Sequence, residues 1–172
     1  MTRLYGFPPV ANKQARILIL GSMPSEESLK QQQYYAHPRN SFWFIMFALF
    51  GEKFSESYQR RCALLKKHHI ALWDVLASCK RQGSLDSNIT NSTIIVNDIV
   101  SFLADHRKIH SIFFNGGMAE KTFNKQVKPL LNDAQRKLPF TRLPSTSPAH
   151  ASLSREAKCQ RWSVILEALD IR

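Results

Sequence analysis

The sequence has few cysteines and no long apolar run. Its three cysteines, Cys62, Cys79 and Cys159, lie far apart and form no CxxC pair, which argues against a zinc site, an iron–sulfur cluster or a disulfide framework. We therefore expect no metal, no cofactor and a reducing, cytoplasmic location. No stretch approaches the roughly 18 apolar residues of a membrane span, and residues 1–16 lack the apolar core of a signal peptide. These absences predict a soluble protein without a membrane partner.

Acidic residues are also scarce. The chain holds 24 Lys and Arg residues against 13 Asp and Glu, for a net charge of +11. Residues 106–161 contain eleven of the basic and three of the acidic residues, so this segment alone carries +8. Such a regional excess is typical of a polyanion partner such as nucleic acid, whose phosphates would then dominate affinity. A requirement for solubility could explain part of the same excess.

Length and hydrophobic pattern predict one α/β domain over residues 1–172. A chain of 172 residues with 44% hydrophobic content closes a single core. Strand-like runs occupy residues 17–20, 70–75, 109–114 and 140–143. Helix-like patterns occupy residues 41–50, 55–68, 98–106, 117–127 and 154–169. This alternation predicts a three-layer α/β/α sandwich around a central four-stranded, mainly parallel sheet.

The connections that follow the four strands should meet at one edge of that sheet, where ligands bind in open α/β folds. These connections are residues 21–40, 76–96, 115–117 and 144–153. The first is the most unusual, since it carries the neighbouring aromatics Tyr34 and Tyr35 followed by His37 and Asn40. Aromatic rings beside polar groups suit a planar, hydrogen-bonding ligand such as a nucleobase.

Five sequence blocks carry a resemblance to a known family. They are GSMPS, YYAHPRNSFW, LWDVLASCKRQGSLDS, IFFNGG and LPSTSPAHASLS, in this order between about residues 16 and 162. Together they resemble the uracil-DNA glycosylase superfamily, and most closely its hypoxanthine-DNA (deoxyinosine) glycosylase branch. The resemblance implies a monofunctional DNA glycosylase that flips a deaminated base out of DNA and hydrolyses its glycosidic bond. Hypoxanthine is the expected main substrate. We expect a monomer without an obligate protein partner.

Two other functions are compatible with the same motifs. One is excision of uracil, or of thymine or uracil mismatched with guanine, by the same fold. The other is a non-catalytic module that binds damaged DNA. Many superfamily members place an Asp or Asn at the position of Met23 to hold the attacking water. Met23 cannot do so, and this favours both alternatives slightly.

The resemblance assigns the catalytic role to Asn40, at the end of the HPRN segment. Its side-chain carbonyl can orient a water but is a poor base. Asn40 could instead only cap the predicted helix 41–50. Ser147 is a second departure from the superfamily pattern, after Met23. A His or Asn commonly stands before the proline of the LPSTSPAHASLS block, and here Ser147 takes that place. Stabilisation of the leaving base by this residue is therefore in question.

Four further residues are expected to contact the base. The resemblance places Tyr35 as the stacking aromatic, although it could simply pack on its own loop. Asn115 offers a donor and an acceptor, or forms a turn before Gly116. His37 could meet a phosphate or a loop carbonyl, and Asp74 could face the pocket or cap a loop. The expected base-binding set is completed by Gly21, Ser22, Met23 and Pro24.

The late loop, residues 144–152, is expected to contact DNA, because its hydroxyls and backbone amides can hold phosphates. The place from which superfamily members push a side chain into the base stack holds Ala151, a poor wedge that would suit weakly paired lesions. No lysine stands in the motifs to form a Schiff base, so lyase activity is not expected. The expected DNA-binding residues are Arg39, Arg142, Ser145, Ser147, Pro148, His150, Ala151, Ser152 and Arg155.

Overall fold

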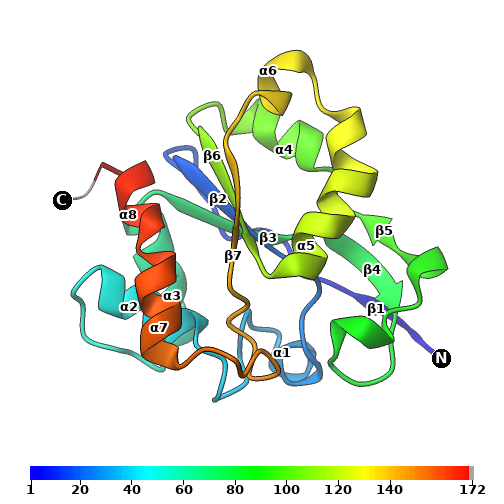
Figure 1. The fold of residues 1–172 in the computed structure, drawn as a ribbon, viewed down its shortest axis with the longest axis horizontal. Coiled ribbons are helices and arrows are strands. Elements are labelled where there is room, and N and C mark those ends of the chain that lie inside the picture. The colour runs from blue at the N-terminus through cyan, green and yellow to red at the C-terminus, as the bar shows by residue number, and fades with distance from the viewer. Residues whose placement is uncertain (171–172) are drawn as a thin grey trace.

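The main sheet has four parallel strands. The computed structural model describes residues 1–170. The strands are β2 (Ile17–Gly21), β3 (Ile70–Asp74), β6 (Ser111–Asn115) and β7 (Phe140–Leu143), in the order β3-β2-β6-β7 (Figure 1). All three pairings are parallel. The predicted parallel sheet is confirmed, and each strand end falls within two residues of its predicted position.

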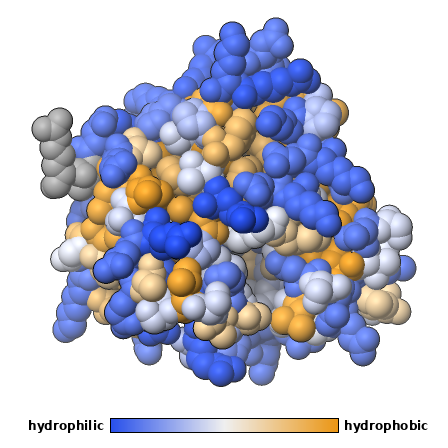
Figure 2. Space-filling model, viewed as in Figure 1, coloured by the Kyte–Doolittle hydropathy of each residue, from blue (hydrophilic) through white to orange (hydrophobic). Residues whose placement is uncertain are grey.

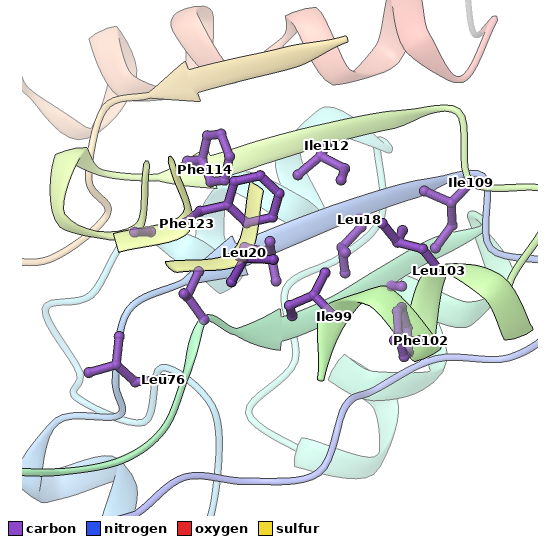
Figure 3. Close-up of a cluster of buried hydrophobic side chains, with 14 of the residues drawn as sticks. Leu18, Leu20, Leu76, Ile99, Phe102, Leu103, Ile109, Ile112, Phe114 and Phe123 are labelled. Atoms are coloured by element: carbon purple, nitrogen blue, oxygen red, sulfur yellow. The ribbon is translucent and has the colours of Figure 1, made fainter. Parts of the chain in front are cut away.

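Helices cover both faces of this sheet. Successive side chains of a strand point to opposite faces, and Ile17 and Ile19 of β2 pack in one apolar cluster while Leu18 and Leu20 pack in another. On the first face lie α2 (Phe42–Leu49), α3 (Tyr58–Lys67), α7 (Arg155–Trp162) and α8 (Val164–Ala168). On the second face lie α4 (Ile99–Asp105) and α5 (Gly117–Thr122), and Figure 3 shows Leu18 and Leu20 within that cluster. The predicted three-layer sandwich is therefore confirmed.

A second, smaller sheet was not predicted. Its strands β1 (Arg3–Tyr5), β4 (Leu76–Lys80) and β5 (Ile95–Val96) pair antiparallel in the order β1-β4-β5. The interpretation of residues 76–96 as a loop was wrong for β4 and β5, which lie within this segment. β5 has only two residues and its pairing with β4 is irregular, so the sequence shows no clear alternation of apolar and polar residues there.

Three helical segments also differ from prediction. Residues 21–40 include a short helix, α1 (Glu26–Gln31), capped by the Ser25 side chain. The helix predicted at 117–127 continues beyond α5 as a π-helical turn, Phe123–Val127. The helix predicted at 154–169 divides at Ser163, whose backbone N–H bonds to the Gln160 carbonyl in a tighter turn. A segment of six or fewer residues spans less than two helical turns, so its hydrophobic pattern does not show where a helix begins or ends.

The remaining short elements lie in connections. They are α6 (Asp133–Arg136) and the 3₁₀ turns Asp86–Asn88, Asn91–Thr93 and Lys128–Leu130. Among residues 1–170, no helix is both long and apolar enough to cross a bilayer.

Candidate active site

A cavity of about 320 Å³ opens at the carboxyl edge of the main sheet. The strand register brings this edge together, because Gly21 pairs with Asp74 and Asn115 with Leu143 at the strand ends. All four connections predicted to meet there contribute to the lining. The lining residues are Gly21, Ser22, Met23, Pro24, Ser25, Ser28, Tyr34, Tyr35, Asn40, Asp74, Ser84, Leu85, Asp86, Ser87, Asn115, Ser145, Thr146, Ser147, Ala149 and His150.

Gly21 allows two polar side chains to converge on the end of β2. A Cβ at Gly21 would lie 2.5 Å from Asp74 Oδ1 and 2.7 Å from the Tyr35 hydroxyl. Contacts this short do not occur for real side chains, so the site requires glycine there. The Tyr35 hydroxyl is buried and has no hydrogen-bond partner among the described residues. It is therefore an unpaired donor that meets Asp74 at the end of β2.

The Tyr35 ring is fixed by local packing. Its centroid lies 4.3 Å from that of Phe42 with a tilt of 31°, and its backbone has φ of 53°. A left-handed conformation is unfavourable for a residue with a Cβ, and such conformations gather at functional sites. The neighbouring Tyr34 is a core residue whose hydroxyl donates to the Pro8 carbonyl at 2.8 Å. Of the two tyrosines, Tyr35 is the one free to contact a ligand.

Asp74 is a buried carboxyl with a perturbed pKa. Burial, followed by repulsion from Asp86, raises the pKa of Asp74 to about 7, against the opposing attraction of Arg81. Burial also raises the pKa of Asp86, although a hydrogen bond from Ser22 Oγ at 2.8 Å opposes the shift. The cavity thus contains a carboxyl that exchanges its proton near neutral pH, which is a common property of functional sites.

Arg81 is the cation behind these carboxyls. It is buried, and it donates from Nη2 to the Pro24 carbonyl at 2.7 Å and from Nε to the Gly83 carbonyl at 2.7 Å. These bonds tie the loop after β4 to the loop after β2. Arg81 thereby both stabilises the acidic groups and fixes the wall of the cavity.

Asn40 lines the cavity and forms a turn directly before α2. Its Oδ1 accepts a hydrogen bond from the Phe42 backbone N–H at 2.9 Å, while Ser41 is the N-cap residue of the helix. A carbonyl oxygen has a second lone pair, and no bond to the Asn40 amide nitrogen is found within residues 1–170. Both groups remain able to bind water.

Asn115 connects the end of β6 to the late loop. Its Nδ2 donates to Thr146 Oγ1 at 2.9 Å, and its Oδ1 accepts from the Thr146 backbone N–H at 2.9 Å. Gly116 permits the close approach, since it has φ of 93° and a Cβ there would lie 3.1 Å from the Ser145 Cβ. Each half of the amide retains capacity for one more hydrogen bond.

The late loop is held from below by a buried lysine. Lys158 is 4% exposed, and its Nζ donates to the Ser147 carbonyl at 3.2 Å. Burial and the nearby Arg155 lower the pKa of Lys158. Within the loop, the hydroxyls of Ser145 and Ser147 accept bonds from the backbone N–H groups of Ser147 and Ala149, which leaves their protons free for a ligand.

The other expected DNA contacts are not part of the cavity lining. Arg39 and Arg142 are exposed, and Arg142 lies 3.7 Å from Glu120. Arg155 is exposed above the Phe44 ring, at 4.9 Å from its centroid. Ala151 and Ser152 are exposed and Pro148 is half-buried. Pro148, Ala151 and Ser152 belong to the same loop as the lining residues Ser147 and His150.

His37 lies outside this cavity. Its Nδ1 accepts from the Arg39 backbone N–H at 3.1 Å, and it lines a second hollow of about 310 Å³ together with Tyr35, Asn40 and Arg155. Tyr35 and Asn40 line both spaces, so His37 lies next to these two residues but not in the lining of the first cavity.

The fold and these motifs can be compared with known proteins. A family model described as the uracil DNA glycosylase superfamily matches residues 8–170. The chain belongs to this superfamily. The resemblance carried by the five sequence blocks is thus confirmed, and the chain is a DNA N-glycosylase with DNA as its substrate.

Individual relatives agree with the family assignment. A hypoxanthine DNA glycosylase from Methanosarcina acetivorans is 35% identical over 161 residues, which cover 93% of this chain and 96% of that protein. A hypoxanthine DNA glycosylase from Methanosarcina barkeri is 41% identical over 112 residues, which cover 64% of this chain and 70% of that protein. The solution NMR structure of a candidate uracil DNA glycosylase from Methanosarcina acetivorans gives a TM-score of 0.80 at 34% identity, covering 98% of this chain and 99% of that one.

The glycosylase site includes residues that the sequence did not single out. Ser84, Leu85, Asp86 and Ser87 line the cavity from the loop after β4. They belong to the QGSLDS part of a block that already carried the family resemblance, so the block itself was the available signal. The sequence does not show that these four residues face the cavity, because the buried Arg81 that anchors their loop cannot be distinguished from a surface arginine.

Proposed function

We propose that this DNA glycosylase excises hypoxanthine from DNA. The observation that carries the proposal is the convergence of Asn40, Asn115 and Tyr35 on one cavity. Hypoxanthine presents an acceptor at O6 and a donor at N1, and the Asn115 amide can complement both with the hydrogen-bonding capacity that Thr146 leaves free. The name shared by the two Methanosarcina relatives supports this substrate.

The proposed reaction is hydrolysis by a positioned water. Breaking the N-glycosidic bond develops positive charge on the deoxyribose and negative charge on the departing base. In our proposal Asn40 orients the water, Tyr35 stacks on the flipped base, and Asn115 bonds the base edge as it leaves. An amide is a poor base, so Asn40 acts by orientation rather than proton abstraction.

The proposed product is an intact abasic site. Schiff-base chemistry requires an amine at the reacting carbon, and the cavity lining within residues 1–170 contains no lysine. Lys158 lies below the late loop, where its Nζ bonds to the Ser147 carbonyl.

We propose that the enzyme acts as a cytoplasmic monomer, for which a single species of 19.8 kDa in sedimentation is the expected result.

Adenine should be rejected by the same contacts. It carries an amino group where hypoxanthine has a carbonyl, so the Asn115 amide donor would face another donor. A mismatched buried polar group of this kind costs on the order of 1 to 3 kcal/mol. The selectivity therefore depends on the exocyclic group of the purine.

A panel of duplex oligonucleotides tests the proposal. Each carries hypoxanthine, uracil, xanthine, thymine opposite guanine, or normal adenine, and strand breakage after alkali reports excision. We expect release of hypoxanthine, slower or no release of uracil, and none of adenine. Efficient uracil release with hypoxanthine untouched would instead favour the uracil activity named for the solved neighbour, and binding without any release would indicate a damage-sensing module.

A further inference from the structure

An exposed leucine lies at the mouth of the cavity. Leu85 is 50% exposed, and it lines the cavity between Ser84 and Asp86. Among the large hydrophobic residues that are exposed within residues 1–170, Leu85 is the one that lines this cavity. Single exposed leucines are common on protein surfaces, so its position alone decides nothing.

The backbone around Leu85 is anchored on both sides. Before it, Ser84 Oγ accepts a hydrogen bond from the Glu26 backbone N–H at 2.9 Å. After it, Asp86 accepts the hydrogen bond from Ser22. The Leu85 carbonyl itself accepts from the Asn88 backbone N–H at 3.0 Å, which closes a 3₁₀ turn.

The base of the same loop is also closed. Arg81 forms an antiparallel bridge with Ile89, and its side chain bonds to Gly83 and Pro24. Residues 82–88 therefore form a short, fixed loop against the loop after β2. An exposed apolar side chain on a fixed loop loses little additional freedom when it inserts into a ligand.

The opposite side of the cavity carries no exposed large apolar side chain among the described residues. Figure 1 shows the loop between β4 and β5 on one side of α1 and the loop between β7 and α7 on the other. The second loop contributes Ala149 and His150 to the lining, with Ala151 and Ser152 exposed beside them. Ala151 is too small to replace an extruded base.

We propose that Leu85 enters the base stack and fills the space left by the flipped nucleotide. This assignment rests on the proposed excision reaction. Flipping a base out of a duplex is unfavourable, and an apolar wedge offsets part of this cost by occupying the gap, as leucine does in some proteins that bend DNA. The wedge thus comes from the loop after β4 instead of the late loop.

Comparison of duplex with single-stranded substrate tests the assignment, because only the duplex has a stack to fill. Leu85→Ala is expected to lower single-turnover excision of hypoxanthine from duplex DNA by about tenfold or more. Excision from the same strand alone should fall much less, because a single strand has no stack for Leu85 to enter. Leu85→Met should retain duplex activity, and Ile95→Ala, an exposed position on β5, is the matched control.

A second readout does not depend on excision. A 2-aminopurine beside the lesion should brighten when the wild-type enzyme binds the duplex and should stay dim with Leu85→Ala. Equal losses on duplex and single strand would overturn the assignment, as would unchanged duplex excision or unchanged fluorescence. Failure of the wild-type enzyme to release hypoxanthine from either substrate would overturn the proposed function, whereas the fluorescence comparison would still decide the role of Leu85.

Discussion

Asn115 and Thr146 hold each other through two hydrogen bonds of 2.9 Å, one in each direction. The pair joins the end of a core strand to a loop that is 31 residues away in sequence. Both residues are buried. The same amide that we assign to base recognition therefore also sets the position of the late loop.

The two roles of Asn115 can be separated by mutation. Asn115→Ala leaves the Thr146 groups unpaired, and we expect the free energy of unfolding to fall by about 1 to 3 kcal/mol with excision of hypoxanthine strongly reduced. Thr146→Val removes one bond but keeps the Asn115 amide, so excision should fall less than about tenfold. Urea unfolding and single-turnover kinetics measure both effects. Equal losses of excision in the two variants would mean that Asn115 only positions the loop.

Asn40 is expected to affect the transition state rather than binding. Asn40→Ala should lower single-turnover excision by about two orders of magnitude while the Kd for lesion DNA changes little. It should also lower the free energy of unfolding by about 1 kcal/mol, because the hydrogen bond to the Phe42 N–H is lost.

Asn40→Ser is the control for this variant. A serine hydroxyl can still accept the Phe42 N–H in the same kind of turn but lacks the amide group, so the variant should be stable and still inactive. Wild-type rates in Asn40→Ser would limit Asn40 to forming this turn and assign the water to another group.

Binding of DNA should weaken steeply with salt, since phosphate contacts release counterions. Arg142 on β7 and Arg155 at the start of α7 are both exposed, and the face shown in Figure 2 mixes hydrophilic with hydrophobic residues. Replacing both with alanine should flatten the slope of log affinity against log salt by about 2. The double variant of Arg107 and Lys108 is matched in charge but lies before β6, at the opposite edge of the sheet. An equal effect of the control would place the DNA-binding surface elsewhere.

Asp74 should make stability depend on pH between its ordinary pKa of 3.8 and about 7. The folded state retains the proton over this window while the unfolded state loses it, so this contribution to stability is complete below about pH 3.8 and is lost as pH rises to about 7. Asp74→Asn removes the ionised form. We expect the variant to gain on the order of 1 to 3 kcal/mol relative to wild type between about pH 4 and pH 8.

Asp98 provides a control of opposite sign. Hydrogen bonding by the Ser101 side chain, followed by that of the Ser101 backbone N–H, lowers the pKa of Asp98. Its contribution is lost as pH falls, so Asp98→Asn should show no gain at high pH. A flat difference between Asp74→Asn and wild type, measured by urea unfolding across the same range, would contradict the assignment at Asp74.

The local pattern of the sequence determined the main sheet and its ligand-binding edge. Four apolar runs alternate with helical patterns, and buried parallel strands leave few other arrangements. The YYAHPRNSFW block also holds Asn40 and Tyr35, and both residues line the cavity. The strand predictions succeeded because burial on both faces leaves a strong signal in each strand by itself.

Tertiary structure alone decided which polar groups meet. Arg81 resembles a surface residue in the sequence, yet it is buried behind Asp74 and Asp86. Asn115 is bonded to Thr146, and Leu85 projects from a loop fixed by Ser22 and Glu26. Burial, hydrogen-bond partners and pKa shifts depend on atoms brought together from distant segments, so no local pattern of residues encodes them.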